Sequence, residues 1–99
     1  MANISVVGRI VSDDIELKIS ANNRPYLRFD LAERTGKGAY ARTQYYQVVA
    51  FGAIASQFAK RGLCRGALIS VEGTLELEDY LKRDGWTRDK RLKVIALRW

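Results

Sequence analysis

Hydrophobic and polar residues alternate along most of this chain, which is the pattern of half-buried β-strands. The alternation is clearest over residues 26–32 and 67–78. Residues 43–51 and 90–99 are dense in β-branched and aromatic residues, which also favour strands. Residues 3–11, with Gly8 marking a bend or a close backbone approach, and the short alternating segment 15–19 predict one long, bent first strand.

The pattern changes to a helical period only over residues 53–61. Ile54 and Phe58 lie four residues apart, and a basic last turn followed by Gly62 is a helix stop signal. The predicted order is therefore five strands with one short helix between the third and fourth. This order predicts an all-β OB-fold, a five-stranded Greek-key barrel, for the single domain 1–99. An unrelated small α+β sandwich has the same element count and stays open.

Composition removes several classes of function. The chain has one cysteine, Cys64, and no histidine, so we expect no disulfide, no metal site and no cofactor. The commonest general base is absent, which argues against an enzyme, although a carboxylate-only site stays open. The sequence shows no apolar run of membrane-spanning length and no signal peptide, so we expect a cytoplasmic protein without a membrane partner.

The net charge of +6 is compatible with a merely soluble surface or with a polyanionic partner. The basic residues gather in two segments that also hold aromatic residues. One is residues 33–42, predicted to be a loop or a loose hairpin tip, and the other is the hairpin 79–89 with Asp84-Gly85 at its tip. Aromatic rings stack on bases without reading them, and Arg and Lys follow phosphates. This placement favours single-stranded nucleic acid.

The segment Thr43-Gln44-Tyr45-Tyr46-Gln47-Val48-Val49-Ala50-Phe51-Gly52 resembles the third-strand motif of the bacterial single-stranded DNA-binding protein family (SSB). The similarity continues through Ala55, Phe58, Lys60 and Gly62. The strand Ile69-Ser70-Val71-Glu72-Gly73 and the opening segment 3–9 also resemble this family. The resemblance implies an OB-fold that binds single-stranded DNA without strong sequence preference and serves replication, recombination or repair.

The resemblance and the strand pattern together nominate stacking and phosphate-binding residues. Tyr45 and Phe51 lie six apart on one strand and so share a face, whereas Tyr46 has the opposite parity and is expected in the core or at an interface. The candidates for DNA stacking are Tyr45, Phe51, Tyr80, Trp86 and Tyr40. The candidates for phosphate contacts are Arg9, Arg28, Arg34, Lys37, Arg42, Lys82, Arg83, Arg88, Lys90, Arg91 and Lys93.

The sequence departs from the family pattern in two respects. Tyrosine stands at stacking positions where tryptophan is typical of the family, so a smaller ring is expected to give weaker affinity. The chain ends at Trp99 without an acidic tail, as a natural tail-less variant or a truncated chain would, so we expect no recruitment of proteins through a tail. The resemblance also implies a homo-oligomer, a tetramer or a dimer.

Two other functions stay open at this point. An OB-fold adaptor, similar to the primosome protein that resembles a tail-less SSB, would bind a protein tightly and DNA weakly. A metal-dependent nuclease would need carboxylates such as Asp13, Asp14, Glu76, Glu78 or Asp79. Asp13-Asp14 fits a turn better, and the glutamates fit the solvent face of a strand, so the nuclease is the weaker alternative.

Overall fold

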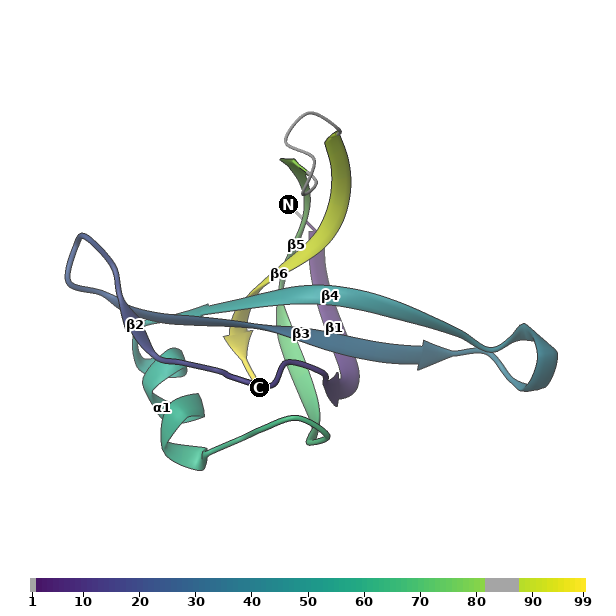
Figure 1. Ribbon diagram of the computed structural model, residues 1–99, viewed down its shortest axis with the longest axis horizontal. Helices are drawn as coiled ribbons and strands as arrows, with labels where there is room; N and C mark the ends of the chain where they lie inside the picture. Colours follow the sequence, from purple (N-terminus) through teal and green to yellow (C-terminus); the bar gives the residue numbers. More distant parts are fainter. Residues whose placement is uncertain (1, 82–87) are drawn as a thin grey trace.

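The computed structural model describes the backbone of residues 2–81 and 88–99 and the side chains of residues 2–77 and 92–99. Its described part contains six strands, one α-helix and one 3₁₀ helix (Figure 1). The strands are β1 (Ala2–Ile10), β2 (Lys18–Ile19), β3 (Pro25–Thr35), β4 (Arg42–Phe51), β5 (Leu68–Leu81) and β6 (Arg88–Arg98). The helices are η1 (Gly38–Tyr40) and α1 (Ala53–Arg61), so the bounds predicted for the α-helix are confirmed.

The five long strands close into a barrel. The order in the sheet is β1-β5-β6-β4-β3-β2, and pairing of Arg9 and Ile10 with Leu31 and Ala32 joins β1 back to β3. All pairs are antiparallel except β4 with β6, which are parallel. This connectivity is that of the OB-fold, so the predicted fold class is confirmed. The helix lies between β4 and β5 because the two-residue β2 is numbered separately.

Gly8 allows the barrel to close. A Cβ placed on Gly8 would lie 2.5 Å from the backbone oxygen of Ala32, far inside van der Waals contact. Only glycine therefore lets β1 come this close to β3, as the sequence predicted for this position.

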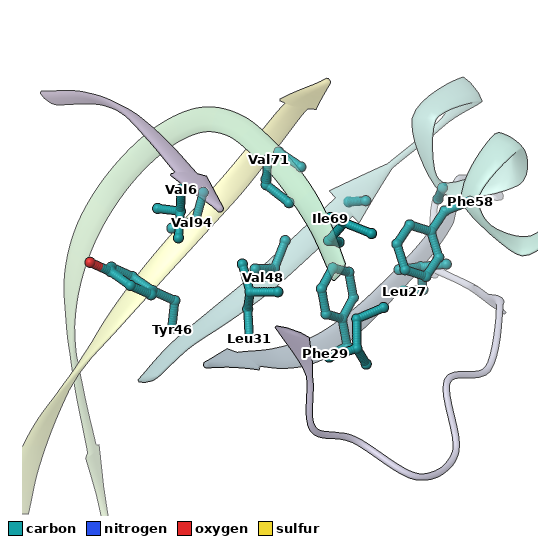
Figure 2. Packing of buried hydrophobic residues seen from close by; sticks show 14 residues of the cluster. Val6, Leu27, Phe29, Leu31, Tyr46, Val48, Phe58, Ile69, Val71 and Val94 are labelled. Carbon is teal, nitrogen blue, oxygen red and sulfur yellow. The ribbon is translucent and has the colours of Figure 1, made fainter. Parts of the chain in front are cut away.

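Alternating side chains of the strands fill the barrel (Figure 2). Val6, Leu31, Val48, Val71 and Val94 are all at most 1% exposed. At the helix end of the cluster Phe58 is 2% exposed and stacks on Phe29 with 4.7 Å between ring centroids. Trp99 packs against Phe58 in a T-shaped arrangement, with 5.3 Å between ring centroids. Through Phe58, α1 closes one end of the barrel. Burying a side chain of this size stabilises the folded state by roughly 1.5–3 kcal/mol.

One prediction about local structure was wrong. Residues 15–19 were expected to form a strand, but only Lys18 and Ile19 pair with β3. The end of β1 occupies this edge of β3 at Asp30, where the Val11 N–H donates to the carbonyl at 3.0 Å and the Ser12 hydroxyl accepts the N–H at 2.7 Å. Residues 33–42 were expected to form a loop or a loose hairpin tip, and β3 and β4 stay paired out to Thr35 and Arg42. The loop is therefore only the tip of a long hairpin, which Figure 1 shows projecting from the barrel.

Candidate nucleic-acid interface

The outer face of β3, β4 and β6 carries alternate residues of the three strands. The register places Tyr26 opposite Phe51, and Ala32 opposite Tyr45. Between these two cross-strand pairs along β4 lies Gln47, whose neighbours in the register are Asp30 on β3 and Lys93 on β6. Because side chains alternate across a strand, these residues point away from the barrel core and form one continuous face. This surface, defined by residues 26, 28, 30, 32, 45, 47, 49, 51, 93 and 95, is called the outer face below.

Tyr45 and Tyr46 lie on opposite sides of β4. Tyr45 is 60% exposed on the outer face, and its neighbour across the strand pair is the small side chain of Ala32. Tyr46 is only 8% exposed and lies at one end of the core cluster (Figure 2). Its hydroxyl donates to the Glu33 carboxylate at 3.2 Å. Burial raises the pKa of Tyr46, and the charge and hydrogen bond of Glu33 raise it further.

Phe51 belongs to a small cluster at the far end of the outer face. Its ring centroid lies 6.3 Å from that of Tyr26, with the rings tilted by 33°. The guanidinium carbon of Arg24 lies 5.2 Å from the Phe51 centroid, within the range of a cation–π contact. A hollow of about 400 Å³ opens beside these rings. It is lined by Ser20, Ala21, Tyr26, Arg28, Gln47, Val49, Phe51 and Lys93.

Figure 1 shows the tip of the β3–β4 hairpin at the opposite end of these strands from α1. Tyr40, in η1, is 85% exposed, and Arg34, Lys37 and Arg42 are exposed around it. By strand alternation Arg34 continues the outer face, whereas Arg42 lies on the other side of the hairpin. The structure therefore places an exposed aromatic ring and three cations on one projecting arm.

The remaining candidate residues are distributed as follows. Arg28 and Lys93 lie on the outer face and line the hollow, whereas the Arg9 guanidinium donates to the carbonyl oxygen of Gly66 at 3.0 Å and so is held on the β1 side of the barrel. Tyr80, in β5, pairs with Asp89 in β6. Arg88, Lys90 and Arg91 flank Asp89 at the start of β6. Lys82, Arg83 and Trp86 lie outside the described residues.

Sequence reasoning did not nominate Arg24, Tyr26 or Gln47. Tyr26 lies two residues before Arg28, so the alternation of the strand already places both side chains on the same face. The sequence could not show that Tyr26 lies close to Phe51, because that depends on the register of β3 against β4. Arg24 lies in the turn before β3, where no strand period assigns a direction to a side chain.

Metal-ligand groups, carboxylate partners and long apolar helices bear on the alternative functions. Among the described side chains, those of residues 2–77 and 92–99, no group of three or more potential ligands is close enough to hold a metal ion. Asp13 pairs with Arg65 at 2.7 Å, so one carboxylate of the nuclease alternative has a cation partner instead. In the same ranges, no helix combines the length and the hydropathy needed to cross a bilayer.

Comparison with known proteins assigns the family. No curated protein sequence matches the chain. Among solved structures, the chain is similar to a small single-stranded DNA-binding protein from Streptomyces coelicolor, with a TM-score of 0.80 and 23% identity over 97% of this chain and 89% of that one. It is also similar to the Plasmodium falciparum SSB in complex with ssDNA, with a TM-score of 0.76 and 16% identity over 97% and 86% of the two chains. The model of the Single-strand binding protein family matches residues 1–98, so the chain belongs to this non-enzymatic family of DNA-binding proteins.

Proposed function

We propose that this protein binds single-stranded DNA without strong sequence preference. The observation that carries the proposal is the outer face itself, where the exposed ring of Tyr45 and the Tyr26–Phe51 pair lie on the same side of the sheet as Arg28 and Lys93. Rings stack on any base, and cations follow the phosphate line, so such a face favours single strands over duplexes. Membership of the family and the similarity to a protein solved with ssDNA support it.

Tyr45 and Phe51 are the central stacking residues in this proposal. Tyr40 extends the path along the β3–β4 hairpin, and Tyr80 and Trp86 extend it along the β5–β6 hairpin. The phosphate contacts come from the two hairpins and the outer face, through Arg28, Arg34, Lys37, Arg42, Lys82, Arg83, Arg88, Lys90, Arg91 and Lys93. Arg9, held by Gly66, contributes only where the strand passes β1.

A titration of intrinsic fluorescence with oligo-dT at several salt concentrations tests the proposal. We expect saturable quenching of the fluorescence. In a plot of log affinity against log salt concentration, the slope should be about −0.7 for each phosphate contact. Oligo-dA and oligo-dC should bind within a small factor of oligo-dT. The same titration with oligo-rU compares RNA with DNA. No quenching and no binding at low salt would refute the proposal and would favour the adaptor alternative.

We also propose that residues 1–99 act as one OB-fold domain in a cytoplasmic homo-oligomer that protects single strands in replication, recombination or repair. Two features support the oligomer. Within the described ranges, the β1 residues Ala2–Val7 pair only with β5, which leaves the other edge of β1 open. Val7, Leu68 and Leu97 are each more than half exposed, and such apolar side chains are typical of subunit contacts. Light scattering of the purified protein measures the subunit number.

A further inference from the structure

The turn before β3 holds Arg24 in a defined place. The Ser20 N–H donates to the carbonyl of Arg24 at 2.8 Å, and the Arg24 N–H donates back to the Ser20 hydroxyl at 3.2 Å. Between them Asn23 has φ of 60°, a left-handed conformation that asparagine tolerates, and its N–H donates to the Ser20 carbonyl at 2.9 Å. The Arg24 side chain therefore projects from a backbone that three hydrogen bonds fix.

That side chain covers an aromatic ring that the proposed function needs. The guanidinium lies over Phe51, beside the backbone of Gly52, and Tyr26 lies against the same ring. Phe51 is half-buried as a result. A base that stacks on the covered side of Phe51 must displace the guanidinium.

The charge of Arg24 is not neutralised by any carboxylate among the described side chains. Within the described part of the chain, Arg24 forms no ion pair, and its only side-chain interaction there is the contact with Phe51. The rings of Phe51 and Tyr26 line the hollow on the outer face. A nucleotide with its base in this hollow brings a phosphate within the reach of a long, flexible arginine.

We propose that Arg24, Tyr26 and Phe51 form a one-nucleotide subsite in which Arg24 exchanges partners. In the free protein its guanidinium covers Phe51, and in the complex it leaves the ring to a base and pairs with a phosphate of the same strand. The inference rests on the proposed binding of single-stranded DNA and adds two residues to it. The exchange is favourable because an exposed cation–π contact is worth roughly two- to fivefold in an equilibrium constant, whereas base stacking is worth roughly five- to 150-fold.

The exchange predicts an unusual salt dependence for the variant Arg24→Gln. This variant loses one phosphate contact, so its plot of log affinity against log salt should be shallower than the parent's by about 0.7. It also loses the cover of Phe51, so at high salt, where phosphate contacts are screened, it should bind as tightly as the parent or up to about fivefold tighter. The two lines therefore cross.

The experiment is the oligo-dT titration of the full chain at five salt concentrations. The parent is compared with Arg24→Gln, with the matched control Lys60→Gln on the exposed side of α1, and with Phe51→Leu and the double variant. We expect Lys60→Gln to keep the parental slope. In the Phe51→Leu background, Arg24→Gln should still lower the slope but bring no gain at high salt.

Each outcome separates the inference from the function on which it rests. Parallel lines for the parent and Arg24→Gln, or an equal loss of affinity at every salt concentration, would overturn the exchange while leaving the proposed function intact. A gain at high salt that persists without the Phe51 ring would also overturn it. A parent that does not bind oligo-dT at any salt concentration would overturn the proposed function itself. Because Arg24 is exposed, thermal unfolding should show equal stability for Arg24→Gln and the parent.

Discussion

Replacing Tyr45 by alanine should weaken DNA binding without weakening the fold. The ring is 60% exposed and its neighbour across the strand pair is Ala32, so its deletion leaves no cavity. Surface substitutions of this kind change the free energy of unfolding by less than about 0.5 kcal/mol. One lost stacking contact costs about 1–3 kcal/mol, which corresponds to a roughly five- to 150-fold rise in Kd.

The adjacent Tyr46 provides the matched control, because it is the same residue type on the opposite side of the same strand. Its ring is 8% exposed and its hydroxyl donates to Glu33. Tyr46→Phe keeps the buried ring and removes only that hydrogen bond, which costs about 0.5–1.5 kcal/mol of folding stability. We expect its Kd for oligo-dT to equal that of the parent.

The assay is a pair of measurements on each variant, namely the Kd for oligo-dT at low salt and the free energy of unfolding in urea. Tyr45→Ala should change the first and Tyr46→Phe only the second. Tyr45→Phe, which keeps the ring, should restore most of the affinity. Equal affinity of Tyr45→Ala and the parent would refute the stacking role, and a loss of stability above about 2 kcal/mol would refute its placement outside the core.

Three further predictions concern stability. Phe58→Ala should destabilise the protein by about 3–5 kcal/mol in denaturant unfolding, because it empties the contact between α1 and the barrel; a loss below about 1 kcal/mol would contradict that role. Gly73→Ala should lower the melting temperature and cost about 1–3 kcal/mol, since the added Cβ would overlap the backbone oxygen of Ile95; an unchanged melting temperature would contradict this close approach. Burial and Glu33 raise the pKa of Tyr46 above 10.0, so the unfolded chain releases this proton first. The contribution of Tyr46 to stability is therefore complete below about pH 10 and is lost as the pH rises from there through the raised pKa. In urea unfolding at a series of pH values, Tyr46→Phe should not show this loss of stability at alkaline pH.

The fold was predictable because its signals are local and repeated. Alternation over residues 26–32 and 43–51 reports burial on one side of a sheet, and the helical spacing of Ile54 and Phe58 interrupts it once. The C-terminal bound of the helix followed from Gly62 and the basic residues before it, and its start followed from Gly52, which was expected to end the preceding strand; the structure has both bounds at the predicted residues. Element order alone then selects few topologies, of which the closed barrel is one.

The error over residues 15–19 arose where backbone hydrogen bonds, and not side-chain patterns, decide the structure. These residues keep an alternating pattern, yet only Lys18 and Ile19 pair with β3, whose edge is occupied at Asp30 by Val11 and Ser12. Residues 33–42 are polar and glycine-rich, which is typical of a loop or a hairpin tip. The sequence did not show how far the strands extend into this segment, and the pairing of β3 with β4 ends at Thr35 and Arg42.

The site divides in the same way into what one strand determines and what pairing determines. Tyr45 and Phe51 share a face because they lie on one strand, so their common direction follows from parity alone. Whether a ring on that face is free to stack depends on its neighbours across the sheet. Opposite Tyr45 the structure has alanine, which leaves the ring open, whereas opposite Phe51 it has Tyr26, with Arg24 two residues earlier covering the ring. Two aromatic residues that the sequence treats as equivalent are therefore unequal platforms. Removing Tyr45 should cost affinity at every salt concentration, whereas the contribution of Phe51 should depend on where the Arg24 guanidinium lies.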